Sequence, residues 1–448
     1  MTEHMDLIVL GAGSGGLAVA QRAAKLGARV ALFEPRELGG TCVNRGCVPK
    51  KAMWFAAQFA QSQSLAAAIG FNVQPAALDW KRFRSLREHY VAEIGRAYAE
   101  RLQASDIRVI RAAAHFVASD TVATQQGDRY HARQIVIATG ARPRTLALPG
   151  FALGMSSDDI FALEAAPGRI GIVGGGYVAV EFACILQALG CEVELLIQRR
   201  MLERFDAGLV ESLALQMQAR GIRIVRPVEI AAAYGEPGAI HLNDAGGMHH
   251  GVYDALLWAI GRTPNSDGLG LASLEVRCDE RGHIRTDAWQ NTSVPGITAI
   301  GDVTDRTALT PVAIAAGHAL AERLFGGRPD ARFDYAAIPS VVFAQPPLGM
   351  VGLTEAQARE KHGDAVRVHQ GRFVPLPYRL AGQETASAIK LVCVGEEGRV
   401  VGIHMLGPGT DELLQGFAVA LRQGLSWHEL KAAVPLHPTA AEELLLLA

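Results

Sequence analysis

Two cysteines, Cys42 and Cys47, stand five positions apart in the segment GGTCVNRGCVPKK, between a glycine pair and a Pro-Lys-Lys run. Such a pair can belong to a zinc site, form a structural bridge, or act as a redox couple that carries electrons. A zinc site needs about four ligands, commonly in closely spaced Cys/His pairs, and no second Cys/His cluster follows this one. The spacing therefore disfavours zinc.

The chain has 448 residues and six cysteines, which is too few for a disulfide-stabilised scaffold. Such usage is typical of reactive or buried thiols in a reducing cytosol, and we expect a cytoplasmic protein. The four cysteines outside the pair are scattered in apolar stretches. We expect them to be buried as small hydrophobic side chains: Cys184, Cys191, Cys278 and Cys393.

The second cysteine opens the stretch CVPKKAMWFAAQFA, which we interpret as a helix that starts at Cys47. A helix N-terminus favours negative charge, and Lys50 and Lys51 are close in sequence. Both effects would lower the pKa of a thiol and favour the thiolate, which is the nucleophile.

The composition excludes several classes of partner. Hydrophobic residues make up 49% of the chain and charged residues 20%, as in ordinary soluble globular proteins. The formal net charge of -2 provides no basic field for nucleic acid. The N-terminal MTEHMD lacks the features of a signal peptide, and no apolar run reaches membrane-spanning length. We therefore expect no nucleic-acid, membrane or metal partner.

A dinucleotide-binding pattern begins the chain. The stretch LIVLGAGSGGLAVAQRAAKLGARVALFE predicts an apolar strand, a glycine turn, a helix and a second apolar strand. Gly11, Gly13 and Gly16 form G-x-G-x-x-G at the turn, where a pyrophosphate can sit on the helix N-terminus. Glu34 follows about twenty residues on, at the position that accepts a hydrogen bond from a ribose hydroxyl.

The pattern recurs in RIGIVGGGYVAVEFACILQALGCEVELLIQRR, where Gly174, Gly176 and Ala179 form G-x-G-x-x-A. The second strand ends in Gln198-Arg199-Arg200 instead of an acid, and Arg204 follows shortly. Arginines can pair with a 2′-phosphate, which a carboxylate would repel. This second site is therefore predicted to bind NADPH, with a solvated surface turn as the alternative.

Two dinucleotide sites and a cysteine pair together predict an electron relay. A pyridine nucleotide delivers two electrons as hydride, and opening a disulfide also takes two electrons. Flavin is the usual converter between these carriers. The predicted route is NADPH to FAD, then to the Cys42–Cys47 disulfide, and then to a disulfide substrate.

The fold class expected is α/β, with two Rossmann-like dinucleotide-binding domains and a C-terminal α+β domain. ATGARPRTLALPG and WAIGRTPNSDGLG resemble crossings between domains. After about residue 334, strand-like segments joined by turns are followed by amphipathic helical stretches. We expect FAD binding by 1–147 and 265–333, NADPH binding by 148–264, and dimerisation through 334–448.

Four segments together resemble the flavin-dependent disulfide reductases, and within them the glutathione reductases. They are GGTCVNRGCVPKK, IVIATG, ITAIGDVTDRTALTPVAIAAGH and PLHPTAAEE, in that family's order along nearly the whole chain. The resemblance implies NADPH-dependent reduction of glutathione disulfide, with one tightly bound FAD in each subunit.

The resemblance also implies roles for individual residues. Cys42 would be the interchange thiol that attacks the substrate, and Cys47 would lie against the flavin as the charge-transfer thiolate. Lys50 would sit near the flavin and pair with Glu181. By the same resemblance, Tyr177 would cover the nicotinamide pocket in the resting enzyme.

A histidine near the C-terminus completes the predicted chemistry. By resemblance, His437 is the general acid-base that protonates the leaving thiolate, with Glu442 orienting it. A group that titrates near neutrality can hold and return that proton. In the family this histidine reaches the partner subunit's flavin, so the resemblance implies an obligate homodimer whose two sites are each built from both chains.

The glycine patterns and the resemblance together imply the residues that contact the two nucleotides. The expected set is Gly11, Gly13, Ser14, Gly15, Gly16, Glu34, Gly40, Thr41, Lys50, Thr139, Gly140, Gly174, Gly176, Tyr177, Ala179, Glu181, Arg199, Arg200, Arg204, Gly261, Arg262, Gly301, Asp302, Leu309 and Thr310. Within it, Asp302 would reach the ribityl chain of the flavin.

The substrate contacts are predicted from position alone. Tyr90 and Tyr98 stand where glutathione reductases place tyrosines that touch the substrate, with helix packing as the alternative. Gln21 and His318 stand where members of the family have arginines, and a neutral histidine would lose a charge-assisted hydrogen bond of about 1.5–3 kcal/mol. Such a loss predicts weaker binding of glutathione disulfide or tolerance of an amide in place of a carboxylate.

Three functions remain open at this point. The first is NADPH-dependent reduction of glutathione disulfide, and the second is reduction of a related small disulfide such as glutathione amide. The third is an NAD-linked dihydrolipoamide dehydrogenase, for which an acid at the end of the second-site strand is expected and Gln198 is found instead. A mercuric reductase is disfavoured because the C-terminal LLLLA contains no cysteine pair.

Overall fold

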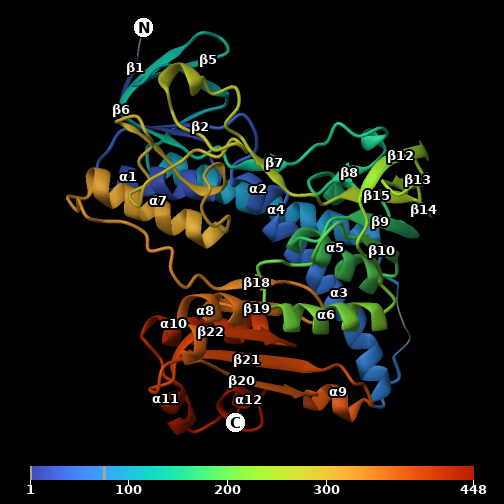
Figure 1. Cartoon of the computed structure of the whole chain (residues 1–448). Helices are drawn as coiled ribbons and strands as arrows, with labels where there is room; N and C mark the ends of the chain where they lie inside the picture. The colour runs from blue at the N-terminus through green and yellow to red at the C-terminus, as the bar shows by residue number, and fades with distance from the viewer. Residues whose placement is uncertain (1–2, 74–76, 448) are drawn as a thin grey trace. The chain divides into compact units, whose positions relative to one another are not determined.

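The computed structural model describes residues 3–73 and 77–447 of the chain (Figure 1). Contacts within these residues divide the chain into two compact units. The first unit combines residues 1–50, 82–144 and 261–335, and the second combines residues 51–81, 145–260 and 336–448.

The first unit is built on a sheet with the strand order β3-β2-β1-β6-β5-β4, in which β17 also pairs with β6. The pairings among β3, β2, β1, β6 and β17 are parallel, whereas β4 and β5 form an antiparallel extension. The strands are β1 (Glu3–Leu10), β2 (Val30–Phe33), β3 (Arg108–Ile110), β4 (Ala114–Ala118), β5 (Thr121–Thr124), β6 (Arg129–Ile137) and β17 (Ile297–Ala299).

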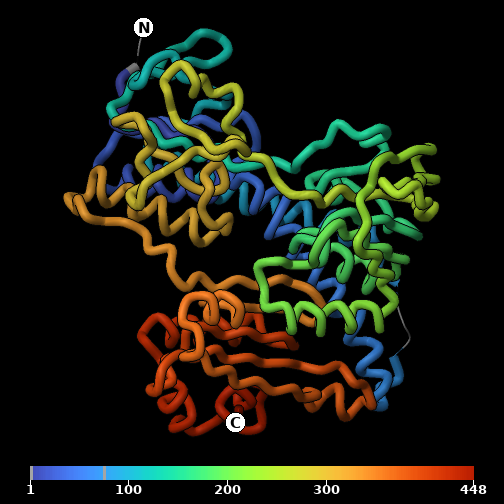
Figure 2. Tube along the Cα trace, in the orientation of Figure 1, coloured from blue at the N-terminus to red at the C-terminus, as the bar shows by residue number. Residues whose placement is uncertain are grey.

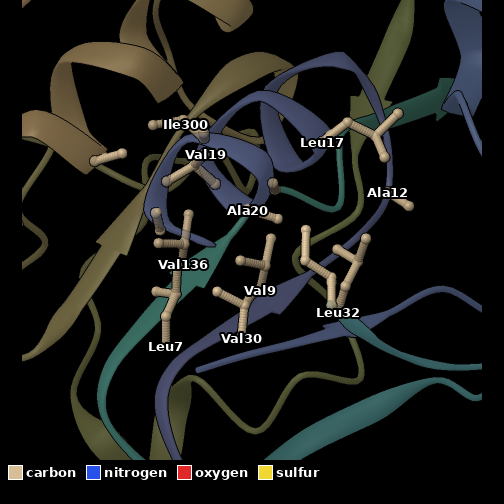
Figure 3. Packing of buried hydrophobic residues seen from close by; sticks show 14 of the residues in the cluster. Leu7, Val9, Ala12, Leu17, Val19, Ala20, Val30, Leu32, Val136 and Ile300 are labelled. Atoms are coloured by element: carbon tan, nitrogen blue, oxygen red, sulfur yellow. The ribbon is translucent and has the colours of Figure 1, made fainter. Parts of the chain in front are cut away.

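Two helices from distant parts of the sequence cover one face of this sheet. Helices α1 (Ser14–Lys25) and α7 (Thr310–Phe325) lie side by side, as the blue and orange segments in Figure 2 show. Leu7 and Val9 of β1 pack under them with Leu17 and Val19 of α1 (Figure 3). The intervening Ile8 and Leu10 belong to the hydrophobic cluster on the opposite face. Alternate side chains of β1 are therefore buried on both faces, as its continuous apolar sequence predicts.

The glycine turn between β1 and α1 allows the helix to start directly against the strand. Gly11 has a φ of +105°, and a Cβ on it would lie 2.4 Å from the carbonyl oxygen of Ala138. A Cβ on Gly16 would lie 1.9 Å from the carbonyl oxygen of Gly11. Only glycine fits at either position without moving the backbone.

The second unit contains a parallel sheet and a smaller antiparallel one. The parallel sheet has the order β11-β10-β9-β15-β8, and the antiparallel sheet has the order β12-β13-β14. The strands are β8 (Met155–Ser156), β9 (Arg169–Val173), β10 (Glu192–Leu196), β11 (Arg223–Val225), β12 (Ile230–Glu236), β13 (Ala239–Asp244), β14 (His249–Tyr253) and β15 (Ala255–Trp258). Helix α5 (Tyr177–Ala188) connects β9 to β10, and α6 (Ala207–Ala219) connects β10 to β11.

The C-terminal part of the second unit is an antiparallel sheet with the order β18-β19-β22-β21-β20. Its strands are β18 (Ser340–Val342), β19 (Leu348–Gly352), β20 (Val366–Phe373), β21 (Ser387–Val394) and β22 (Arg399–Leu406). Its helices are α8 (Glu355–His362), α9 (Leu376–Leu380), α10 (Thr410–Arg422), α11 (Trp427–Ala432) and α12 (Glu442–Leu445). One hydrophobic cluster joins the sheet to α10, α11 and α12 through Leu391, Leu414, Leu430 and Leu444.

The two predicted crossing segments pair with each other in the first unit. Strand β7 (Ala141–Pro143) lies antiparallel to β16 (Arg262–Pro264). Beside this pair, the Thr139 hydroxyl donates to the Asn265 carbonyl at 2.7 Å, and the Asn265 side chain donates to the Thr139 carbonyl at 2.9 Å.

Three further helices connect the strands: α2 (Gly40–Asn44), α3 (Cys47–Ala68) and α4 (Trp80–Ala104). Helix α3 starts at Cys47, so the prediction of a helix start there is confirmed. The contact boundary after Lys50 falls inside this helix.

The predicted fold class is confirmed: the two strand–turn–helix–strand patterns each form a parallel βαβ unit, and the C-terminal part is α+β. The finer division at residues 147, 264 and 333 stays a prediction. The two compact units change at residues 144, 260 and 335, and residues 51–81 group with the second unit instead of the first part of the chain.

The contact at Gly16 generates a stability prediction. We expect Gly16→Ala to destabilise the fold by about 1–3 kcal/mol, because the added methyl group overlaps the Gly11 carbonyl and the start of α1 must move. Thermal unfolding followed by circular dichroism should show a lower midpoint. The matched control is Gly95→Ala in α4, where a Cβ meets nothing within 4 Å and the higher helix propensity of alanine should keep or raise the midpoint. Equal midpoints for Gly16→Ala and the unmodified protein would contradict the prediction.

Candidate functional site

The two thiols of the predicted redox pair meet at the N-terminal ends of helices. The Cys42 thiol is hydrogen-bonded with Cys47 and also with the side chains of Ser14 and Thr310. The Sγ atom of Cys47 lies 3.8 Å from Oγ1 of Thr310. Ser14, Cys47 and Thr310 are the first residues of α1, α3 and α7. The positive ends of these helix dipoles therefore face the thiols, an arrangement that stabilises one negative charge.

The pKa of Cys42 is raised by its surroundings, whereas the sequence predicts a lowered pKa for a thiol of the pair. The hydrogen bond with Cys47 raises the pKa of the Cys42 thiol, and burial and the charge of Cys47 raise it further, whereas the hydroxyls of Thr310 and Ser14 oppose this. The sequence did not indicate this elevation at Cys42, and a lowered pKa for a thiol of the pair stays a prediction. The site stabilises one thiolate, but a second thiolate beside it would be repelled by the first. One thiol of the pair therefore keeps its proton.

Lys51, whose charge is predicted to favour a thiolate, has partners that the sequence did not indicate. Its Nζ lies 3.0 Å from Asp411 Oδ2, 3.5 Å from the ring centre of Trp54 and 3.9 Å from that of Phe343. These cation–π and ionic contacts belong to the second unit and hold α3 against the start of α10. The cation of Lys51 is therefore engaged with this aromatic and acidic cluster.

The first glycine turn has the open face that a dinucleotide requires. A Cβ on Gly13, the N-cap of α1, would meet no atom within 4 Å. A Cβ on Gly15 would instead lie 3.3 Å from the Ala313 side chain, so this glycine allows α1 to pack on α7. Gly40 also approaches the turn, because its Cβ would lie 2.7 Å from the Cα of Gly13. The turn is thus packed on one side, with open space beside Gly13.

Glu34 follows β2 and is turned toward the glycine turn. Its Oε2 accepts a hydrogen bond from the Ala12 N–H at 2.8 Å, and its Oε1 accepts one from the Arg36 N–H at 2.9 Å. These two bonds fix a buried carboxylate beside the turn, and each oxygen keeps a lone pair for a ribose hydroxyl. The geometry fits the predicted contact with the ribose.

Asp302 provides a second test of whether the residues fit FAD. Its side chain is partly buried after Gly301, and burial raises its pKa, whereas the nearby Arg262 charge opposes this. Among the described residues, the Asp302 carboxylate forms no hydrogen bond. A partly buried carboxylate of this kind fits an acceptor for the hydroxyl groups of a bound ligand. Arg262 itself donates to the Ala141 carbonyl and lies 3.4 Å from the Thr41 hydroxyl.

The remaining predicted FAD contacts surround these groups with backbone turns. Gly140, Gly261 and Gly301 have positive φ values of 69°, 110° and 75°. Leu309 is the N-cap of α7, immediately before Thr310. The set fits a cofactor that lies along the glycine turn and reaches the thiol pair, although the individual contacts stay predictions.

The second glycine turn lies beside the predicted phosphate-binding arginines. A Cβ on Gly174 would lie 2.2 Å from the Ala259 carbonyl, and a Cβ on Gly175 would lie 2.7 Å from the Arg200 carbonyl. Arg199, Arg200 and Arg204 are exposed. They form no ion pair with any residue that the structure describes, so their charges are available to a phosphate.

Helix α5 places its first residues in different environments. Tyr177 is the first residue and is half exposed, at 50%. Gly176, its N-cap, would accept a Cβ without any contact within 4 Å. Ala179 is fully buried, so it supports the turn from inside instead of presenting a side chain to a ligand. Glu181 is buried and accepts a hydrogen bond from the Phe343 N–H at 2.9 Å. Its predicted pairing with Lys50 stays a prediction.

His437 and Glu442 form the predicted pair near the C-terminus. The Nδ1–H of His437 donates to Oε2 of Glu442 at 2.9 Å, and the Thr439 N–H donates to Oε1 at 3.1 Å. The hydrogen bond from His437 lowers the pKa of Glu442, so the carboxylate is ionised at neutral pH. The His437 side chain is 78% exposed. This arrangement fixes the ring tautomer and directs Nε2 away from the pair, as acid-base chemistry requires.

The predicted substrate residues are distributed over exposed helix surfaces of the first unit. Tyr90 is 55% exposed on α4, and His318 is exposed on α7. Tyr98 packs against the hydrophobic cluster under α1, which supports the helix-packing alternative for this residue. Gln21 is half-buried in α1. Substrate contact by any of them stays a prediction.

Three of the four remaining cysteines are buried, as predicted, and one is not. Cys184, Cys191 and Cys393 have relative exposures of 2%, 5% and 1%. Cys278 is exposed, so the prediction is wrong for this residue. It lies two residues after the buried Val276 and is not part of the hydrophobic cluster to which Val276 belongs.

Contacts between distant residues were not predictable from any local pattern. Residues 343–345 bind α3 and α5 at once: the Trp54 indole donates to the Ala344 carbonyl at 3.1 Å, and Phe343 holds Glu181. These partners lie 290 and 162 positions apart. A segment with this composition carries no sequence signal for such contacts.

Residues 3–73 and 77–447 were also compared with the requirements of a metal site and of a membrane-spanning helix. Within those ranges, no group of three or more His, Cys, Asp or Glu side chains is arranged to hold a metal ion. In the same part of the chain, none of the helices has both the length and the apolar character that crossing a bilayer demands.

Comparison with known proteins matches nearly the whole chain to a single family. The family model described as pyridine nucleotide-disulphide oxidoreductase matches residues 5–317, and the model of the dimerisation domain of that family matches residues 338–448. A glutathione reductase of Schizosaccharomyces pombe is 41% identical over 461 aligned positions, which cover 100% of this chain and 99% of the relative. A glutathione reductase of Yarrowia lipolytica is 37% identical over 464 positions, covering 99% of each chain.

The thiol pair generates a prediction about pH. We expect Cys47→Ala to lower the pKa of Cys42, because the hydrogen bond with Cys47 is the largest cause of its elevation. The thiolate of Cys42 should then form at lower pH. Alkylation of the reduced protein by iodoacetamide at a series of pH values, with mass spectrometry of each cysteine peptide, measures the shift. The exposed Cys278 is an internal reference whose profile should not move. An unchanged or higher midpoint for Cys42 would contradict the prediction.

Proposed function

The chain belongs to the pyridine nucleotide-disulphide oxidoreductase family, and we propose that it reduces glutathione disulfide with NADPH, by way of bound FAD and the Cys42–Cys47 pair. The observation that carries the proposal is the pair itself, two hydrogen-bonded thiols at helix N-termini beside a dinucleotide-type glycine turn. The chemistry that bound FAD supplies is the conversion of a hydride from NADPH into the electron pair that opens the Cys42–Cys47 disulfide.

The substrate assignment rests on the relatives that match over their full length. Both are named glutathione reductase, and together they favour glutathione disulfide over glutathione amide or lipoamide. The absence of an acid after β10 agrees with NADPH instead of NADH, because Gln198, Arg199 and Arg200 occupy that position.

The dithiol performs the exchange in two steps. The thiolate of Cys42 attacks one sulfur of glutathione disulfide, which forms a mixed disulfide and releases one glutathione thiolate. Cys47 then attacks the Sγ of Cys42, which forms the Cys42–Cys47 disulfide and releases the second glutathione. Two thiols are oxidised, one disulfide is reduced, and the two thiol protons end on the two glutathione molecules.

The raised pKa of Cys42 explains why this exchange needs a base. The thiol that must attack is the one that keeps its proton, because the hydrogen bond with Cys47 and burial hold it there. His437 accepts this proton and returns it to the leaving thiolate. Glu442 keeps the ring in the tautomer whose Nε2 can take the proton.

His437 acts on the dithiol of a second subunit in this proposal. The segment before it exposes Val434 at 92% and Leu436 at 75%, and the matched C-terminal model is a dimerisation domain. Exposed apolar side chains next to a catalytic histidine are expected where a partner covers them. A homodimer would bury this segment and bring His437 to the partner's thiols. We also propose that the chain has the four-part domain division predicted above, with boundaries after residues 147, 264 and 333, and that the protein is cytoplasmic.

A turnover panel tests the proposed function. Purified protein is assayed with NADPH and with NADH against glutathione disulfide, its amide, lipoamide and cystine, and the highest kcat/KM is expected for NADPH with glutathione disulfide. In Cys42→Ser, disulfide turnover should be lost while NADPH still reduces the flavin, observed as bleaching of its visible absorbance. Cys278→Ser, an exposed cysteine outside the pair, should retain full turnover. Disulfide turnover by Cys42→Ser at the normal rate would refute the role of this thiol.

For His437→Ala we expect turnover to fall by about 10²–10⁴, the usual cost of a lost acid-base group. Reduction of the flavin by NADPH should be unchanged, because the histidine acts only on thiol exchange. His428→Ala is the control, since this exposed histidine lies on α11 in the same C-terminal part. If turnover by His437→Ala fell only a few-fold, His437 would not be the acid-base group of the exchange.

Mixed dimers test whether His437 acts on the thiols of its own chain or on those of the partner subunit. Co-expression of Cys42→Ser and His437→Ala chains produces heterodimers in which one site combines an intact Cys42 with the partner's intact histidine. If His437 acts across the dimer, the purified heterodimer regains about half of the normal turnover, as one of two sites is intact. If the histidine acts within its own chain, both sites remain defective and no activity returns.

A further inference from the structure

A buried cluster of three charged side chains lies in the second unit, away from the groups that carry the proposed reaction. Lys390 of β21 places its Nζ 3.0 and 2.9 Å from the two carboxylate oxygens of Asp206 and 3.0 Å from Oε2 of Glu355. The side chains of Lys390 and Asp206 are 9% and 5% exposed. Burial of charged groups is costly unless they are paired, so this arrangement calls for an explanation.

The pKa shifts of Lys390 and Glu355 both favour the charged forms of these two groups. Burial alone would lower the pKa of Lys390, but the hydrogen bonds to Asp206 and Glu355 outweigh it, and the pKa is raised. Burial raises the pKa of Glu355, and the hydrogen bonds from Lys390 and Arg359 outweigh that, so this pKa is lowered. The ammonium group of Lys390, on the C-terminal sheet, is therefore paired with a carboxylate at the start of α6 and with another at the start of α8.

Asp206 has a second task at the start of α6. It is the N-cap of this helix, and its Oδ1 accepts hydrogen bonds from the N–H groups of Gly208 at 3.1 Å and Leu209 at 3.3 Å. The same carboxylate therefore fixes both the first turn of α6 and the position of the chain immediately before it.

That preceding chain is the arginine loop, residues 197–206, which carries Arg199, Arg200 and Arg204. Its middle is attached to the second glycine turn, because the Leu202 N–H donates to the Gly175 carbonyl at 2.8 Å. Its end is attached through Asp206 to Lys390. The loop is thus held at its start, where the Ile197 N–H donates to the Val225 carbonyl at 2.9 Å, at its middle on the glycine turn, and at its end on the C-terminal sheet.

Other contacts join α6 to the C-terminal sheet without reaching the loop. Arg372 of β20 donates to the Ser212 hydroxyl at 3.0 Å, and the Gln216 side chain donates to the Ala386 carbonyl at 2.9 Å. These bonds would suffice to attach the helix. The contact between Lys390 and Asp206 differs because it lies at the junction of helix and loop.

We infer that Lys390 is a positioning residue for coenzyme selectivity: through Asp206 it holds the arginine loop in the position that receives the 2′-phosphate of NADPH. This inference rests on the proposed function, which makes NADPH the reductant. A residue of the C-terminal sheet then contributes to discrimination between NADPH and NADH although it lies outside the nucleotide-binding sequence pattern. A merely structural link would change stability and leave this discrimination unaltered.

The test compares two ligands that differ in one phosphate, adenosine 2′,5′-bisphosphate and adenosine 5′-phosphate. Isothermal titration of the flavin-loaded full-length protein measures both dissociation constants. In Lys390→Met we expect the bisphosphate to bind at least about tenfold more weakly, the cost of one charge-assisted hydrogen bond to the phosphate, and adenosine 5′-phosphate to bind as before. In steady-state assays the KM for NADPH should rise by a similar factor with kcat and the parameters for NADH unchanged.

Three further variants separate positioning from general damage. Asp206→Ser keeps an N-cap residue on α6 but is too short to reach Lys390, so it should reproduce the loss of selectivity. Lys390→Arg should restore bisphosphate binding to within about twofold, since it retains the cation. Arg372→Ala removes a neighbouring bond from α6 to the sheet and should leave both ligands unaffected.

The outcomes distinguish the inference from the function on which it rests. If the unmodified protein binds both ligands equally well, the assignment of NADPH fails and the inference fails with it. If the unmodified protein prefers the bisphosphate and both Lys390→Met and Asp206→Ser keep that preference, only the role of Lys390 is overturned. If Lys390→Met fails to fold, the binding measurements on Asp206→Ser test the role of the ion pair, because this variant keeps an N-cap residue on α6.

Discussion

The chemistry of this protein depends on one constraint, the close approach of α1 to the end of β1. Because Gly16 carries no side chain, α1 starts in contact with the Gly11 carbonyl, and its first residue, Ser14, reaches the Cys42 thiol. Helix α7 packs beside α1 and brings Thr310 to the same pair. The helix dipoles that meet there stabilise one negative charge in a partly buried site. A wider turn would separate the thiols from this environment.

Within that environment, the two thiols are not equivalent. Cys42 keeps its proton because Cys47 is hydrogen-bonded to it and because it is half-buried. A dithiol that holds only one negative charge needs a separate group to accept the second proton before it can attack a substrate. In the proposed function His437 is that group, and its pairing with Glu442 fixes the ring tautomer through a carboxylate whose pKa is lowered.

In the second unit, the charges of the arginine loop are positioned by the backbone that carries them. The arginines after β10 are exposed and form no ion pair with described residues, so only the backbone determines where they lie. That backbone is attached to the glycine turn at Leu202 and to the C-terminal sheet at Asp206. In the inference drawn above, this attachment connects coenzyme recognition to the C-terminal sheet, because moving Asp206 away from Lys390 would break a buried ion pair.

The sequence by itself determined the βαβ units, the helix start at Cys47 and the residues of the thiol pair, because glycine spacing, apolar runs and cysteine spacing are local properties of the chain. It also indicated the His437–Glu442 pair, whose members are five positions apart. It was wrong about the burial of Cys278 and did not indicate the raised pKa of Cys42 or the partners of Lys51, since each depends on neighbours. The contacts of Lys51 with Asp411 and of Lys390 with Asp206 join residues 360 and 184 positions apart. Only the tertiary structure could decide these, because burial and electrostatic pairing arise from distances that folding creates.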